Sequence, residues 1–156
     1  MRVNIYQCES LPPADSNGTS DPYIEVWSPD ETKVRTDNCE DTNNPIYYQS
    51  KEVIYEFDDL DTAPPLILNV FDCDEGVLGV GDSEDYIGRA VIFLRDLAPE
   101  DLSNDDSIPY PSWYPVKVGY SDVYNEEGGA AILCSFQLIP EDQEYSIPAE
   151  EIELEN

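Results

Sequence analysis

The chain has 156 residues, a length that suits one domain with a core large enough to fold without disulfide bonds. It carries 35 Asp and Glu against 7 Lys and Arg, so its formal net charge is -28. This excess of acid excludes nucleic acid as a partner, because phosphate backbones require a basic surface. It also disfavours binding to an anionic membrane unless a cation reverses the local charge.

Several classes of active site are excluded by the residues that the sequence lacks. Without histidine, neither a Ser-His-Asp triad nor a zinc site of the Cys/His kind can form. We also find no nucleophile elbow and no phosphate-binding loop, so we expect no enzymatic activity. The sequence has four cysteines, which lie far apart without a C-x-x-C pair: Cys8, Cys39, Cys73 and Cys134. We expect them to be reduced thiols, as in a cytoplasmic protein.

No targeting or membrane-spanning segment is recognisable. No apolar run approaches the roughly 18 residues of a membrane span, and the N-terminus lacks a signal-peptide pattern. We therefore expect a soluble chain, and we expect it to be a monomer.

Short segments rich in β-branched and aromatic residues alternate with turn sequences along the whole chain. In the first segment, Val3 and Ile5 alternate with Asn4 and Cys8, which predicts two different faces of one strand. We expect eight strands, at residues 2–9, 22–28, 32–36, 51–57, 66–72, 86–94, 113–118 and 130–139. Such strands predict an all-β fold, an eight-stranded antiparallel β-sandwich, with a helical turn or two at residues 95–105.

The sequence divides into a domain and an acidic extension. Residues 1–139 hold all the expected strands and form the domain. Residues 140–156 carry many acids, two prolines and no basic residue, so burial cannot repay the entropy of ordering them. We expect a disordered tail or linker.

Aspartates concentrate in two loops that follow expected strands, at residues 15–23 and 72–88. Carboxylate oxygens are the ligands that Ca²⁺ selects. Two carboxylates about 4 Å apart repel by roughly 4 kcal/mol at an effective dielectric near 20, so a cluster of them favours a bound cation. The alternative is that a chain with 18 Asp scatters them over every loop. The candidate calcium ligands are Asp15, Asp21, Asp72, Asp74, Asp82 and Asp85.

Four motifs together resemble a C2 domain, the calcium- and phospholipid-binding β-sandwich. They are L-x-x-x-D-S-N-G-T-S-D-P-Y-I, N-N-P ahead of an aromatic residue, L-N-V-F-D-C-D and D-Y-I-G-R-A-V-I. The resemblance covers about residues 1–139. The runs S-W-Y-P-V-K and A-I-L-C-S-F-Q-L-I are similar to those of ferlins, large multi-domain membrane-fusion proteins. The strand order resembles the permuted, type II topology of the family.

The resemblance implies a ligand set. In its first calcium loop the family has two aspartates six positions apart, matched by Asp15 and Asp21. In its third loop it has a D-x-D pair and a later aspartate, matched by Asp72, Asp74 and Asp85. The resemblance adds Asp82 as a peripheral ligand and the main-chain carbonyls of Ala14 and Cys73. It implies that two to three Ca²⁺ ions bind.

One loop departs from the usual family pattern, because the ten residues 75–84 separate the D-x-D pair from the last aspartate. This insertion puts the roles of Asp82 and Glu75 in doubt. It also adds Val77, Leu78 and Val80 at a loop tip. Either these side chains fold back on the sandwich, or they insert into a membrane once calcium docks the domain.

The family's phosphoinositide patch has only a weak counterpart here. The basic residues available for it are Lys33, Arg35 and Lys51, which stand among acids and suit solvated strand faces.

The sequence thus predicts a calcium-dependent module that binds anionic phospholipid, as part of a larger membrane-anchored, ferlin-like protein of membrane trafficking or vesicle fusion. It would be cytoplasmic and recruited to the membrane by calcium. The alternative is a protein–protein interaction module with an acidic surface, in which calcium is structural or absent.

Overall fold

The structure is a computed structural model, and it describes residues 1–12, 20–29, 32–39, 41–74, 83–103, 107–118 and 129–140. For residues 74, 83 and 84 it describes the backbone alone. The described part of the chain contains no helix that is long and apolar enough to cross a membrane.

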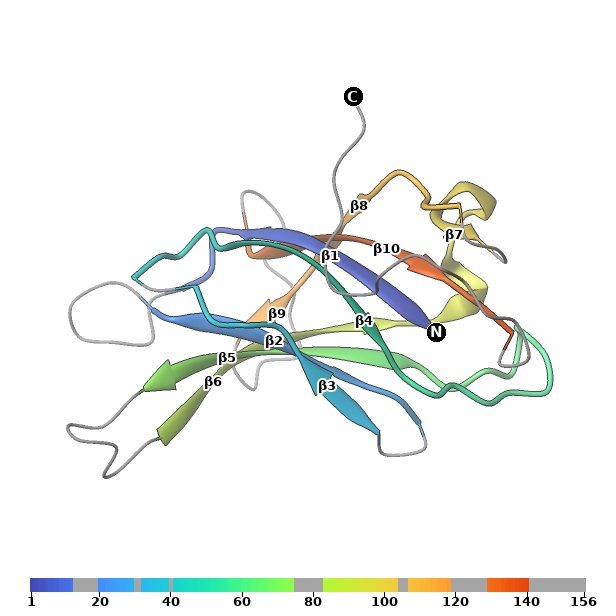
Figure 1. The fold of residues 1–156 in the computed structure, drawn as a ribbon, viewed down its shortest axis with the longest axis horizontal. Helices are drawn as coiled ribbons and strands as arrows, with labels where there is room; N and C mark the ends of the chain where they lie inside the picture. The colour runs from blue at the N-terminus through green and yellow to red at the C-terminus, as the bar shows by residue number, and fades with distance from the viewer. Residues whose placement is uncertain are drawn as a thin grey trace.

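Two β-sheets of five strands each lie face to face (Figure 1). Sheet A has the order β4-β1-β10-β7, and β8 also pairs with β10. Its strands are β1 (Arg2–Glu9), β4 (Ile46–Glu52), β7 (Leu102–Ser103), β8 (Ser112–Pro115) and β10 (Ala131–Gln137). Sheet B has the order β3-β2-β5-β6-β9. Its strands are β2 (Pro22–Trp27), β3 (Lys33–Arg35), β5 (Leu66–Asp74), β6 (Ser83–Ile92) and β9 (Lys117–Val118).

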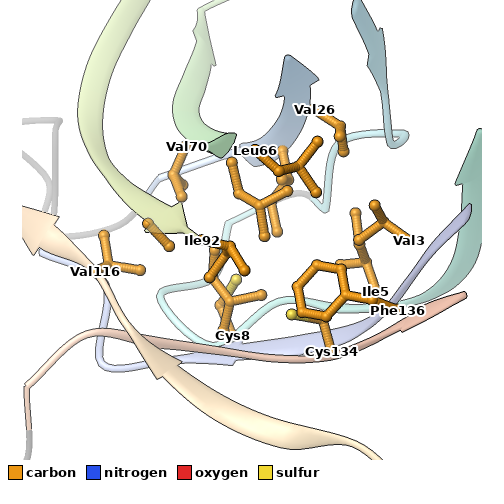
Figure 2. Packing of buried hydrophobic residues seen from close by; sticks show 14 of the residues in the cluster. Val3, Ile5, Cys8, Val26, Leu66, Val70, Ile92, Val116, Cys134 and Phe136 are labelled. Carbon is orange, nitrogen blue, oxygen red and sulfur yellow. The ribbon is translucent and has the colours of Figure 1, made fainter. Parts of the chain in front are cut away.

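The core lies between the two sheets, where alternate residues of the central strands meet (Figure 2). In β5, Leu66, Leu68 and Val70 are fully buried, because every second side chain of a strand points to the same face. Side chains from both sheets, such as Val26 and Phe136, fill the same space. This packing confirms the predicted all-β sandwich.

A β-bulge in β1 places Cys8 on the other face of the strand from the one expected. The register with both neighbouring strands shifts between Ile5 and Gln7. Because a bulge adds one unpaired residue, the side-chain alternation reverses beyond it. Cys8 therefore joins Val3 and Ile5 in the core, and its predicted place on the opposite face is wrong.

The strand expected at residues 51–57 lies at Ile46–Glu52 instead. It pairs with β1 in a register that sets Glu52 opposite Arg2, the first residue of β1. Tyr47 and Tyr48, which precede the expected strand, are therefore part of the sheet.

The segment expected as one strand at 113–118 crosses from one sheet to the other. Its first half, β8, pairs with β10, and its second half, β9, pairs with β6. Val116 lies between them and is fully buried. Two 3-10 turns, η2 (Leu94–Asp96) and η3 (Pro99–Asp101), take up the region where helical turns were expected. The short strand β7 then pairs with β10 in parallel.

Strand directions give the sandwich two different ends. At the "aspartate end", β1 and β5 finish while β2 and β6 begin. At the "opposite end", β10 and β2 finish while β1, β3 and β5 begin. The closing strand β10 lies beside β1, as the type II topology predicts.

Candidate functional site

Asp72 occupies the last core-facing position that the structure describes in β5. It follows Leu68 and Val70 at two-residue intervals, so its side chain points between the sheets, and it is 0% exposed. Its Oδ1 accepts a hydrogen bond of 2.7 Å from the backbone N–H of Asp21. Burial of a carboxylate is costly unless hydrogen bonds or charges compensate it, so this position is an unusual one for an acid.

Asp21 connects the two aspartate-bearing segments. Its backbone carbonyl accepts a hydrogen bond of 3.0 Å from the N–H of Cys73. Its carboxylate oxygen Oδ1 accepts another, of 2.6 Å, from the N–H of Asp41. Residues separated by about fifty positions in the sequence therefore meet at the aspartate end.

Asp85 completes the described part of this end. It lies in β6 directly opposite Asp72, and its side chain is exposed. Side chains of such cross-strand pairs have Cβ atoms about 4.5–5.5 Å apart. The backbone of Asp74 pairs with Ser83 further along the same two strands.

Several of the predicted ligands cannot be placed. Asp15, Asp82 and the carbonyl of Ala14 lie outside the described residues, and so does the side chain of Asp74. Cys73 is described, and its N–H donates a hydrogen bond to the Asp21 carbonyl. Among the residues that the structure does describe, no three or more Asp, Glu, Cys or His form a group that could hold a metal ion.

A segment that carries the N-N-P motif lies beside the two described ends of the first aspartate loop. Residues 39 and 41–45 are hydrogen-bonded to the chain on both sides of residues 13–19. On one side Cys8 and Leu11 donate to Pro45 and Asn43, and on the other Thr42 donates to the Ser20 carbonyl. The N-N-P motif was the available signal, and its three residues accept hydrogen bonds from the chain just before residue 13.

The predicted membrane-inserting residues Val77, Leu78 and Val80 also lie outside the described residues.

The basic residues are distributed differently from the expectation. Lys33 and Arg35 lie on β3 of sheet B, whereas Lys51 lies on β4 of sheet A. Arg89 of β6 and Lys117 of β9 join the first two on sheet B. No sequence pattern links these two to the others, because only the strand register brings them to the same sheet.

The four cysteines, all in the described part of the chain, form no disulfide bond. Cys8 and Cys134 are buried, and desolvation raises the pKa of each thiol well above its usual value. A thiol with a raised pKa is a poor nucleophile, so these two cysteines act as core residues.

Comparison with known proteins identifies a family and relatives that the chain is similar to. A model of the C2 domain matches residues 1–116. The chain is 34% identical over 104 residues to an uncharacterized protein of Schizosaccharomyces pombe, covering 67% of the chain and 8% of that protein. It is 29% identical over 157 residues to myoferlin of Xenopus tropicalis, covering 95% of the chain and 7% of myoferlin.

A solved structure shares the fold. A C2 domain of plant extended synaptotagmin 1 aligns with a TM-score of 0.63 and 17% identity, over 86% of this chain and 90% of that domain. The chain spans less than a tenth of the length of the two curated relatives above. Because the C2 domain model matches residues 1–116 and the structure has the same fold as a known C2 domain, the chain belongs to the C2 domain family.

Proposed function

We propose that the chain is a calcium-dependent phospholipid-binding module of a ferlin-like protein of membrane trafficking. The observation that carries the proposal is the fully buried Asp72 carboxylate, held by the N–H of Asp21 and facing Asp85 across the strand pair. An acid in that position destabilises the apo fold unless a cation compensates its charge.

The residues at the aspartate end suit Ca²⁺ by their chemistry. They offer oxygen donors on protein loops and strand ends, which is the donor type that Ca²⁺ selects over softer metals. Asp21, Asp72 and Asp85 would be joined by Asp15 and Asp74, and by Asp82 with the carbonyls of Ala14 and Cys73 at the periphery. The five principal carboxylates, without the peripheral Asp82, carry five negative charges, which two to three Ca²⁺ would balance. The bound cations would supply the positive charge that attracts lipid phosphate.

The protein's own charge sets the specificity of this docking. Because the chain has a formal net charge of -28, an anionic membrane repels it in the absence of calcium. Neutralisation would be confined to the aspartate end, so that end alone would face the bilayer. The proposed localisation is the cytoplasm, with recruitment to a membrane when calcium rises. The similarity to myoferlin over 95% of the chain supports a place within a larger, membrane-anchored protein.

Sedimentation with anionic liposomes tests the proposal. The double variant Asp72→Asn, Asp74→Asn should no longer sediment in calcium, whereas the wild-type chain should. The matched control Asp58→Asn, Asp61→Asn removes the same charge from exposed positions of the β4–β5 connection, at the opposite end. Sedimentation of the first variant at the wild-type level would refute the mechanism.

The alternative function is a protein-interaction module whose acidic surface binds a basic partner. A thermal melt with and without millimolar CaCl₂ separates the two. Calcium that binds the native state must raise the unfolding midpoint, whereas an unchanged midpoint favours the alternative.

A further inference from the structure

The basic residues of this acidic chain gather on one surface. Only seven Lys and Arg are present, and all of them are described. Four of the seven lie on sheet B: Lys33, Arg35, Arg89 and Lys117. In a chain of net charge -28, such a concentration points to an anionic ligand for this surface.

Strand register aligns three of these cations in one row. Residues directly opposite each other in neighbouring strands run across the whole sheet in the order Arg35, Glu25, Asn69, Arg89, Lys117. Their chain neighbours Ile24, Val26, Leu68, Val70 and Ala90 are core residues. The row therefore lies on the outer face of sheet B, away from the core. We call this surface, with Lys33, the basic face.

Aromatic rings lie on the same face. The guanidinium carbon of Arg35 is 3.6 Å from the centroid of Tyr23, and the ammonium nitrogen of Lys33 is 4.8 Å from the centroid of Trp27. Tyr23 in turn stacks on Phe71, with centroids 5.5 Å apart. Because these rings orient the cations, less side-chain entropy is lost when an anion binds.

Two of the cations repel each other. Arg89 and Lys117 are directly opposite in the β6–β9 pair, and like charges in that position destabilise a sheet. A negative group placed over the pair would relieve the repulsion.

The chain carries a segment of complementary charge. Residues 141–156 contain seven acidic residues and no basic one. They follow β10, which finishes at the opposite end, where β2 also finishes and β3 begins. This end of sheet B bears Trp27 and Lys33.

Residues 141–156 are long enough to reach across the outer face of sheet B. Sixteen residues reach up to about 50 Å when extended. The two sheets of a sandwich are about 10 Å apart, and crossing five strands takes roughly 20 Å. Because the segment is tethered, its effective concentration near the face is in the millimolar range, which favours it over a free acidic peptide.

We propose that residues 141–156 dock on the basic face and cover its four cations. The contact is electrostatic and does not require the segment to fold. It weakens as salt is added, because exposed charges are screened beyond the Debye length. A basic face covered in this way is withheld from other anionic ligands until the segment is displaced.

Zero-length cross-linking of the full chain with a carbodiimide tests the proposal. The reagent joins a lysine amine to a carboxylate that touches it. The chain has three lysines, Lys33 and Lys117 on the basic face and Lys51 on sheet A, so Lys51 serves as the internal reference. Mass spectrometry of the monomer should find residues 141–156 linked to Lys33 and Lys117 several-fold more often than to Lys51. The difference should disappear in about 0.5 M NaCl, where the Debye length is about 4 Å.

A charge variant that keeps the reporting lysines sharpens the test. Arg35→Gln with Arg89→Gln should lower the yield of these links several-fold, whereas Arg95→Gln, in η2 outside the row, should leave it unchanged. Equal linkage to Lys51, links found only between two molecules, or an unchanged yield in the double variant would each overturn the proposal. The proposed calcium ligands include none of the residues tested here, so failure of this proposal leaves the proposed function standing.

Discussion

Asp72→Asn should separate the electrostatic from the structural role of the buried aspartate. Asparagine keeps the oxygen that accepts the 2.7 Å hydrogen bond from Asp21 and removes the charge. At a cross-strand separation near 5 Å, the repulsion between Asp72 and Asp85 is about 3 kcal/mol at an effective dielectric of 20 and about 0.8 kcal/mol in bulk water. Because Asp85 is exposed, we expect a gain in apo stability between these limits.

The same substitution should remove most of the response to calcium. A ligand at 100 times its dissociation constant stabilises the native state by about 2.7 kcal/mol. For a chain of this size, 1 kcal/mol raises the unfolding midpoint by roughly 2–4 °C, so the wild-type midpoint should rise by roughly 5–11 °C. The variant lacks one carboxylate of the proposed calcium site and should shift by less than half as much.

Differential scanning calorimetry of both chains, in chelator and in excess calcium, measures these two effects. Asp58→Asn at an exposed turn is the control for a simple change in net charge. The reasoning is refuted if the variant gains as much from calcium as the wild type. It is also refuted if apo Asp72→Asn is less stable than apo wild type, because the buried charge would then stabilise the fold by itself.

Three further substitutions test other parts of the chain. Leu78→Asp should weaken calcium-dependent liposome binding and leave calorimetric calcium affinity in solution nearly intact; equal liposome affinity would exclude membrane insertion. Asn4→Ala should lower the free energy of unfolding by about 2–4 kcal/mol in urea titration, because Asn4 is fully buried and its loss leaves buried hydroxyl and amide partners unsatisfied; a loss below about 1 kcal/mol would contradict this role. Gly88→Ala should destabilise by about 1–3 kcal/mol or more, because a Cβ there would lie 2.3 Å from the carbonyl oxygen of Lys117; an unchanged urea midpoint would show that β9 moves freely.

The sandwich was predictable because local patterns mark its strands. The apolar run at 66–72 and the alternation in β1 reflect burial on fixed faces, and both segments are strands in the structure. The strand at Ile46–Glu52 was misplaced because its limits are set by pairing with β1, a partner distant in the sequence. The bulge that turns Cys8 into the core likewise depends on two neighbouring strands.

Only part of the candidate site could be predicted from the sequence. Asp21, Asp72 and Asp85 could be named from motif spacing, and the structure brings them to one end. The contacts of residues 39 and 41–45 could not be read from the sequence, because they are mainly backbone hydrogen bonds, which any residue except proline can donate. The role of these aspartates as calcium ligands stays a prediction.

The basic face shows the limit of reading charge from sequence. Arg35, Arg89 and Lys117 are dispersed over more than eighty residues among many acids, and no window of the sequence marks them as a group. They form a row only because β3, β6 and β9 belong to one sheet in one register.

Asp72 and Asp85 of the aspartate end belong to sheet B, the same sheet that carries the basic face. In β5, Asp72 points into the sandwich while its neighbour Phe71 points outward, where it contacts Tyr23 and Tyr86. One aromatic row therefore separates an acidic end from a row of cations on the outer surface. Opposite charges held this close attract each other through the sheet, so the basic face offsets part of the repulsion among the aspartates when calcium is absent. Loss of cations from the face should accordingly make the apo chain less stable and its stability more dependent on calcium.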